Sequence, residues 1–229
     1  MQQRSYRYLD VITVAFITVL LCANVIGAGK VANIGGLSLT VAVLIFPASY
    51  LFGDILTEVY GYGRDRRVVW AGFAALAFAS FMAWVALSLP AAPGDFNQAY
   101  QAHMEGVFGN TWRIVAGSMI AFWCGSFANS YVMARMKVRM EGRRLWMRTI
   151  GSTVVGEAVD SGLFYFIAFY GIWPDAQVAK IALAQYLLKT SWEIVMTPVT
   201  YRVVAALKRA EDEDWYDRNT DFNPFHIRV

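Results

Sequence analysis

Charged residues are scarce in this chain. Lysine, arginine, aspartate and glutamate make up 16% of its 229 residues, whereas 57% are hydrophobic and the mean hydropathy is +0.40. In a typical soluble domain about a quarter of the residues are charged. The composition therefore excludes an ordinary soluble domain and predicts a single membrane domain, residues 1–229, in contact with a lipid bilayer.

Cysteine and histidine are also rare. The two cysteines, Cys22 and Cys124, fall in apolar segments, where a thiol behaves as a small hydrophobic group. His103 and His226 have no cysteine or carboxylate at the spacing of a metal site. We therefore expect free thiols, no metal and no cofactor.

The motifs of several enzyme classes are missing. The chain has no Gly-x-x-x-x-Gly-Lys phosphate loop, so we do not expect it to hydrolyse ATP by itself. Asp160-Ser161-Gly162 resembles an aspartic protease motif, but it occurs once and within an apolar segment. Gly61-Tyr62-Gly63-Arg64 lacks the aspartate of an intramembrane protease. The sequence predicts that the protein is not an enzyme.

Six apolar segments are long enough to cross a bilayer as helices, for which about 20 residues each are needed. They cover residues 8–28, 37–60, 68–89, 112–133, 149–170 and 178–207. The sequence thus predicts an all-α bundle of six transmembrane helices followed by a tail, residues 208–229. The longest connection, residues 90–111, is expected to contain a short helix lying over the outer mouth.

Arginine and lysine are distributed unequally between alternate connections. They gather at the N-terminus, in the connections 61–67 and 134–148, and in the tail, whereas the opposite connections hold Lys30, Arg113 and Lys180. Because positive residues stay in the cytoplasm, both termini are predicted to be cytoplasmic. Sorting by side, rather than clustering on one surface, also argues against a nucleic-acid partner.

Ionisable residues lie inside three of the apolar segments. Asp54 and Glu58 are four residues apart on one helical face, close to the cytoplasmic end of their segment. Each charge at such depth costs roughly 2.5 to 3.5 kcal/mol, so it is seldom kept without a ligand, an ion or a partner. Arg148 and the arginines of the connection 61–67 could pair with these carboxylates and simply stabilise the fold.

The other two segments carry Glu157 with Asp160, and Lys189 with Glu193. These groups are expected near the middle of the membrane, where a buried ion pair of Lys189 with Asp160 or Glu193 could hold two helices together. One lysine cannot neutralise three carboxylates, however, and carboxylates accept paired hydrogen bonds from a donor-rich ligand edge. The residues alone therefore predict a carrier of a small cationic or donor-rich solute.

Neutral side chains can complete such a site. Asn129 both donates and accepts hydrogen bonds, and Trp123 could stack on a flat ligand, although helix packing explains both residues almost equally well. Alanines recur at a four-residue interval at Ala71, Ala75, Ala79 and Ala83. Small residues on one face allow close helix packing, within the bundle or across a homodimer.

The sequence resembles the queuosine precursor transporter family of bacterial inner-membrane proteins, which is grouped with vitamin uptake transporters. The resemblance covers nearly the whole chain and is carried by Ala23-Asn24-Val25-Ile26, Gly29-Lys30, Phe46-Pro47, Asp54-Ile55-Leu56-Thr57-Glu58-Val59-Tyr60-Gly61-Tyr62, Asn129-Ser130-Tyr131, Leu145-Trp146-Met147-Arg148-Thr149-Ile150-Gly151-Ser152, Gly156-Glu157-Ala158-Val159-Asp160-Ser161, Tyr186-Leu187-Leu188-Lys189, Glu193, Thr197-Pro198 and Tyr216-Asp217-Arg218-Asn219-Thr220-Asp221-Phe222-Asn223-Pro224-Phe225.

The resemblance implies uptake of 7-deazaguanine precursors of a modified tRNA nucleoside, namely 7-cyano- or 7-aminomethyl-7-deazaguanine or the base queuine. It also implies a six-helix fold similar to the substrate-binding components of energy-coupling-factor transporters. We expect Asn129, Asp160 and Glu193 to bind the purine-like edge and Lys189 to set their charge state. The other expected residues are Glu157, Asn24 and Trp123 in binding, and Asp54, Glu58, Arg148 and Lys30 in gating or coupling.

Three alternatives remain open from the sequence. The chain could be a substrate-binding subunit that needs a separate ATP-driven energising module. It could carry another small cationic or purine-like solute. It could also be a structural membrane protein without transport, in which case it would not bind a 7-deazaguanine.

Overall fold

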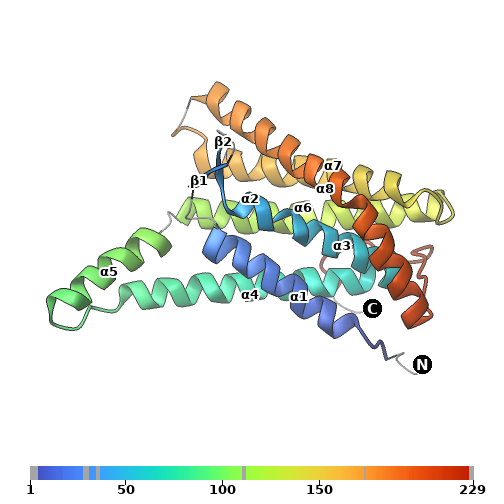
Figure 1. Cartoon of the computed structure of the whole chain (residues 1–229), viewed down its shortest axis with the longest axis horizontal. Coiled ribbons are helices and arrows are strands. Elements are labelled where there is room, and N and C mark those ends of the chain that lie inside the picture. The colour runs from blue at the N-terminus through green and yellow to red at the C-terminus, as the bar shows by residue number, and fades with distance from the viewer. Residues whose placement is uncertain (1–4, 28–30, 35–36, 110–111, 173, 227–229) are drawn as a thin grey trace.

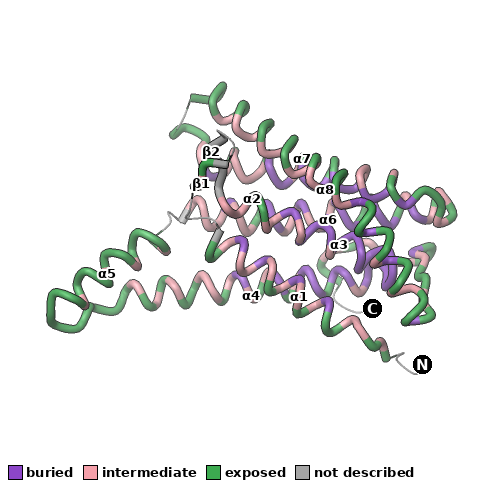
Figure 2. Tube along the Cα trace, in the orientation of Figure 1, coloured by how far each residue is buried: buried purple, intermediate pink, exposed green. Residues whose placement is uncertain are grey.

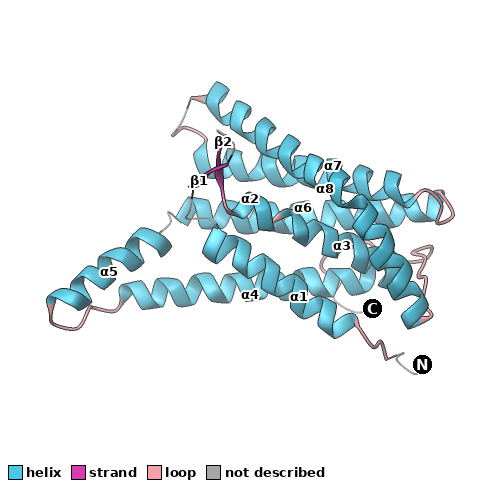
Figure 3. Cartoon of the chain, in the orientation of Figure 1, coloured by secondary structure: helices cyan, strands magenta, loops and turns pink. Residues whose placement is uncertain are grey.

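The computed structural model describes residues 5–27, 31–34, 37–109, 112–172 and 174–226. These residues form an all-α bundle with one small hairpin of two strands (Figures 1 and 3). The elements are α1 (Leu9–Leu21), the π-helix η1 (Cys22–Gly27), β1 (Val31–Ile34), β2 (Leu37–Thr40), α2 (Ala42–Ile45), α3 (Pro47–Tyr60), α4 (Tyr62–Ser88), α5 (Asp95–Phe108), α6 (Trp112–Arg139), α7 (Leu145–Phe169) and α8 (Asp175–Glu211).

Helices cover most of the predicted segments. The pair α1 and η1, and the helices α4, α6, α7 and α8, coincide closely with five of the expected transmembrane segments. Among the described residues, Leu9–Ile26 and Tyr62–Ser88 are long and apolar enough to cross a membrane. The all-α prediction is thus confirmed, and the crossing of the membrane by the other helices stays a prediction.

The predicted continuous helix over residues 37–60 is wrong. Its first residues form β2, which pairs antiparallel with β1, and the short helix α2 follows. A new helix, α3, begins at Pro47, whose ring fixes a helical φ and whose missing N–H is not needed in a first helical turn. The ionisable residues of this segment therefore lie on a helix of 14 residues rather than on a full-length span.

A helix is present in the connection 90–111, as expected, but it does not cover the bundle. The helix α5 has no buried residue, and Gln101 ties it to α4 by donating to the Leu87 carbonyl oxygen at 3.1 Å. With the second half of α4 it forms an arm that extends away from the other helices (Figures 1 and 2). The helix itself was expected, and its position relative to an outer mouth stays a prediction.

The helix α3 lies at the centre of the fold. It packs against α1, α4, α6 and α8, and nearly all its residues are buried, including the charged Asp54 and Glu58. Burial is concentrated in the half of the molecule that holds both termini (Figure 2). The core there includes Leu20, Leu56 and Met133.

The helices α6 and α7 make the most extensive helix contact of the fold. Gly125 of α6 faces Gly156 of α7, and a Cβ on either glycine would lie 3.0 Å from the carbonyl oxygen of the other. Two backbones can approach this closely only where side chains are absent. This contact fixes the position of the polar side chains that follow on both helices.

The two termini lie at the same end of the bundle (Figure 1). Tyr6 donates from its hydroxyl to Glu213 at 2.8 Å, and the backbone N–H groups of Arg7 and Tyr8 donate to the Glu211 carboxylate at 2.9 and 2.7 Å. Their common end agrees with the predicted topology. Which side of a membrane this end faces stays a prediction.

Candidate functional site

A buried ion cluster joins α7 and α8. The Nζ atom of Lys189 lies 2.6 Å from Asp160 Oδ2 and 2.9 Å from Glu157 Oε2, and it also sits 4.4 Å from the centre of the Phe46 ring. The alternative prediction of a Lys189–Asp160 pair is thus confirmed, and Glu157 is added to it. The cluster holds one cation and two carboxylates, so it keeps a formal charge of −1.

Tyr50 borders this cluster and was missed by the sequence analysis. It is buried, its hydroxyl donates to the Gly156 carbonyl oxygen at 3.5 Å, and it interacts electrostatically with Asp160 and Glu157. Tyr50 lies four residues before Asp54 and therefore on the same face of α3. That spacing was the signal that could have identified it.

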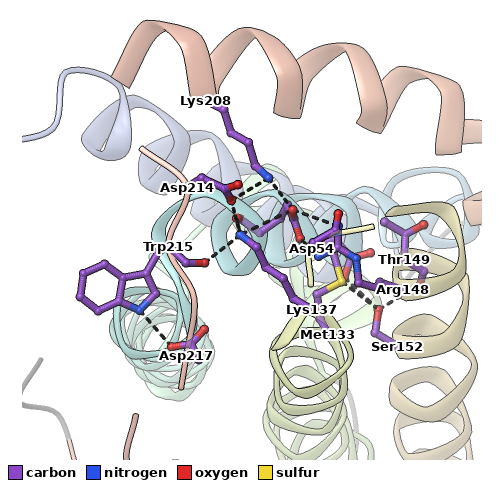
Figure 4. Close-up of polar contacts among 12 residues, drawn as sticks. Asp54, Met133, Lys137, Arg148, Thr149, Ser152, Lys208, Asp214, Trp215 and Asp217 are labelled. Carbon is purple, nitrogen blue, oxygen red and sulfur yellow. Dashed lines mark hydrogen bonds and ion pairs between the residues drawn. The ribbon is translucent and has the colours of Figure 1, made fainter. Parts of the chain in front are cut away.

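A second polar group joins α3, α6 and α7. Asp54 Oδ1 accepts a hydrogen bond from Asn129 Nδ2 at 2.7 Å and one from Ser152 Oγ at 3.2 Å (Figure 4 shows Asp54 and Ser152). All three residues are almost fully buried. The structure thus brings Asp54, expected in gating or coupling, into direct contact with Asn129, expected in binding.

Glu193 of α8 is a further buried carboxylate, on a helix that packs against α3. Its side chain is 1% exposed, and its carboxylate interacts electrostatically with Asp54 and with Glu157. Neither of its oxygens has a hydrogen-bond partner among the described residues, and the same holds for Asp54 Oδ2 and Asn129 Oδ1. Buried acceptors are normally satisfied, so this surplus matches a ligand that supplies protons or positive charge.

A third cluster surrounds Glu58, and Figure 4 shows its partners Arg148, Lys208 and Lys137. Arg148 donates to both Glu58 oxygens, at 2.6 and 3.1 Å, and Lys208 donates to one of them at 2.6 Å. The predicted pairing of Glu58 with Arg148 is therefore present. Lys137 lies 3.6 Å from the same carboxylate and donates to the Glu58 carbonyl oxygen at 2.5 Å.

Asp214, in the tail, completes the third cluster. It accepts hydrogen bonds from Lys137 at 2.5 Å and lies 2.8 Å from Lys208 (Figure 4). Burial alone would raise the pKa of the Asp214 carboxyl, but the two lysines outweigh it and hold this pKa below its ordinary value. In the sequence, Lys137 and Lys208 indicate only the topology, and nothing near them predicts their pairing with Asp214.

The tail continues along α4 and α6. Arg66 donates to the carbonyl oxygens of Asp221 and Asn223 at 2.8 and 2.6 Å, and the Trp70 ring N–H donates to the Pro224 carbonyl oxygen at 2.8 Å. Phe225 then reaches the Trp123 ring, with 5.4 Å between ring centres. The tail is therefore docked onto the helices rather than extended into solvent.

Trp123 belongs to an aromatic cluster with Trp70, Phe127 and Phe225. These contacts lie on the side of α6 that faces α4. The expected role of Trp123 in substrate binding stays a prediction.

Asn24 lies in the π-helix η1, a type of helix frequent at functional sites. It donates to the Leu20 carbonyl oxygen at 2.9 Å and accepts from Ser118 Oγ at 3.0 Å. Lys30 lies outside the described residues.

Both cysteines are free thiols, as expected. Within the described part of the chain, no group of three or more histidine, cysteine, aspartate or glutamate residues could hold a metal ion.

Comparison with known proteins gives concordant matches. The family model described as "Putative vitamin uptake transporter" matches residues 40–203. A protein of Bacillus subtilis (strain 168) named "Probable queuosine precursor transporter" is 30% identical over 189 residues, which cover 82% of this chain and 80% of the relative. The "Queuosine precursor transporter" of Escherichia coli (strain K12) is 28% identical over 220 residues, which cover 93% of this chain and 94% of the relative.

No solved structure matches the chain. The relatives are named transporters, in agreement with the expectation that the chain is not an enzyme. The match of the family model over most of the chain and the coverage of both relatives lead to one conclusion: the chain belongs to the queuosine precursor transporter family of vitamin uptake transporters.

Proposed function

We propose that the protein imports 7-deazaguanine precursors of queuosine, such as 7-aminomethyl- or 7-cyano-7-deazaguanine, across the bacterial inner membrane. Both relatives are named as transporters of queuosine precursors. The site would lie between α3, α6, α7 and α8, with six spans and both termini in the cytoplasm.

The observation that carries this proposal is the surplus of buried acceptors over cations. Lys189 is paired with both Asp160 and Glu157, so one positive charge in this cluster stands against two carboxylates. A guanine-like ring offers adjacent N–H donors on one edge, which a carboxylate accepts as two parallel hydrogen bonds. The ammonium group of the aminomethyl precursor would add charge complementarity to the negative cluster.

In this arrangement Asp160 and Glu157 face the substrate, and Lys189 balances part of their negative charge. Asn129 adds an amide that can donate and accept. Asn24 and Lys30 are assigned to the outer entrance, and Glu58 with Arg148 to the cytoplasmic exit. The aromatic ring of Phe46, which already contacts Lys189, would offer a flat apolar surface beside the ring of the substrate.

Uptake of labelled 7-aminomethyl-7-deazaguanine into proteoliposomes that contain only this chain tests the proposal. The wild type should take up the compound, and Asp160→Asn should reduce uptake strongly because the charge and one acceptor are lost. The exposed Glu105→Gln on α5 is the matched control and should behave as wild type.

Wild-type uptake by Asp160→Asn would contradict the assigned site. Binding of the compound by the purified chain without uptake would instead favour a substrate-binding subunit that needs an energising module. Absence of both binding and uptake would contradict the proposed function.

A further inference from the structure

We propose that Asp54, together with Glu193, forms a proton-binding site that is separate from the Lys189 cluster and couples substrate import to the proton gradient. The proposal rests on the proposed function for its substrate. It concerns a different pair of carboxylates and a different ligand.

The two carboxylates come from α3 and α8, which pack against each other, and both lie in the interior. Asp54 of α3 is 0% exposed and Glu193 of α8 is 1% exposed, and they interact electrostatically. Asp54 Oδ1 is held by Asn129 and Ser152, whereas Asp54 Oδ2 and both Glu193 oxygens lack a hydrogen-bond partner among the described residues. Hydrogen bonds thus hold one of the four carboxylate oxygens of the pair, and the other three accept none from the described residues.

No cation of the described chain forms an ion pair with either carboxylate. Lys189 is paired with Asp160 and Glu157, and Arg148 and Lys208 are paired with Glu58. Asp65 of α4 and Glu157 of α7, which also act on the pair, are both negative. Among the described residues, neither carboxylate therefore has an ion-pair partner that would balance a negative charge.

A buried carboxylate that lacks a compensating cation is costly to keep charged, and binding of a proton removes this cost. Protonation turns one carboxylate oxygen into a donor. The buried carbonyl oxygen of Asn129 finds no hydrogen-bond partner in the described part of the chain, although the amide NH₂ of the same side chain donates to Asp54. A proton on the pair would supply the donor that this acceptor lacks.

The position of the pair suits coupling. Tyr50, Asp54 and Glu58 follow one another at four-residue intervals on one face of α3, about 6 Å apart along the axis. Tyr50 borders the Lys189 cluster and Glu58 anchors the cluster at the predicted cytoplasmic end. Asp54 therefore lies between the proposed substrate site and the proposed exit, where loss of its proton could follow passage of the substrate.

The experiment compares two readouts of the same proteoliposomes. An inward gradient of about one pH unit should drive up to about tenfold accumulation if one proton accompanies one substrate molecule. Exchange of labelled for unlabelled substrate at equal pH needs no gradient. Asp54→Asn, which mimics the protonated state, should keep exchange and lose the gradient-driven accumulation, whereas the control Glu105→Gln should keep both.

Gradient-driven accumulation by Asp54→Asn at the wild-type level would overturn the proposal, as would wild-type accumulation that follows a sodium gradient and not the pH gradient. Absence of both exchange and uptake in the wild type would contradict the proposed function instead. If the wild type shows neither exchange nor uptake, infrared spectroscopy of the purified substrate-free chain still detects whether a carboxyl group of the pair is protonated. The C=O stretching band of a protonated carboxyl group should be present at neutral pH and weaken in Asp54→Asn and Glu193→Gln; a spectrum without it would overturn the site.

Discussion

The indole ring of Trp215 lies directly against Gly61, the residue that ends α3. A Cβ on Gly61 would come within 2.1 Å of Trp215 Cδ1, and the backbone N–H of Trp215 donates to the Val59 carbonyl oxygen at 3.3 Å. Tyr216 approaches Gly142 just as closely, with 2.1 Å from its hydroxyl oxygen to the position of a Cβ. The tail thus packs against the α3–α4 junction at Gly61 and against the α6–α7 junction at Gly142.

Gly61→Ala should destabilise the protein. Gly61 has a φ of 87°, which costs a residue with a Cβ about 1–3 kcal/mol, and the new methyl group would displace Trp215 as well. Thermal unfolding in detergent measures the effect. Gly106→Ala on the exposed helix α5 is the control, because a Cβ there meets nothing within 4 Å; equal melting temperatures of both variants would contradict the role of this contact.

Arg148→Met should be far more damaging than Arg143→Met. Arg148 is paired with the fully buried Glu58, and removal of one partner of a buried pair typically costs about 3–5 kcal/mol. Arg143 pairs with Glu141 at 3.7 Å, and both side chains are largely exposed, so about 0–1 kcal/mol is expected. Chemical or thermal unfolding of both variants distinguishes these values, and a similar small loss in each would show that Glu58 does not depend on Arg148.

The stability of the docked tail should fall in acid. Because Lys137 and Lys208 hold the pKa of Asp214 below its unfolded value, the ionised carboxylate stabilises the folded state above the unfolded pKa. This contribution is lost as the pH falls through the folded pKa. Limited proteolysis of the tail across acidic pH measures it.

Asp214→Asn should remove the part of this pH dependence that the carboxylate causes and leave the tail less protected at neutral pH. Asp95→Asn on the exposed arm is the matched control. An unchanged pH profile in Asp214→Asn would show that another group controls docking of the tail.

Much of the fold was predictable because the apolar segments have helical length. The pairing of Lys189 with Asp160 also followed from their expected depth, and the pairing of Glu58 with Arg148 followed from their common end. These interactions depend on the axial position of a residue along its helix, which the sequence defines well.

Interactions that depend on the packing of distant segments were not predictable. The polar tail looked like a cytoplasmic extension, since nothing local shows that Asp214 meets Lys137 or that Phe225 reaches Trp123. The segment 37–60 was predicted as one helix because its hydropathy is continuous, whereas backbone pairing of β2 with β1 and the ring of Pro47 decide its structure. Asp54 was assigned to the exit by depth alone, and the rotation of α3 turns it towards Asn129.

Gly156→Ala should impair substrate binding more than it impairs folding. Its Cβ would lie 2.8 Å from Asn129 Cβ and 2.9 Å from Tyr50 Cε1, so α6 and α7 must separate or both side chains must shift. Overpacking of this kind typically costs about 1–3 kcal/mol, which most folds survive. Gly162→Ala on the same helix is the control, because a Cβ at that exposed position meets nothing within 4 Å.

The measurement is binding of 7-aminomethyl-7-deazaguanine to the purified variants, with thermal unfolding in parallel. If the α6–α7 contact positions Asn129 and Tyr50 for the substrate, affinity should fall clearly in Gly156→Ala and stay unchanged in Gly162→Ala. Unchanged affinity together with a lowered melting temperature would mean that the close contact of the two glycines stabilises the bundle but does not position the binding residues. The two outcomes therefore distinguish a role of the Gly125–Gly156 contact in substrate binding from a role in packing alone.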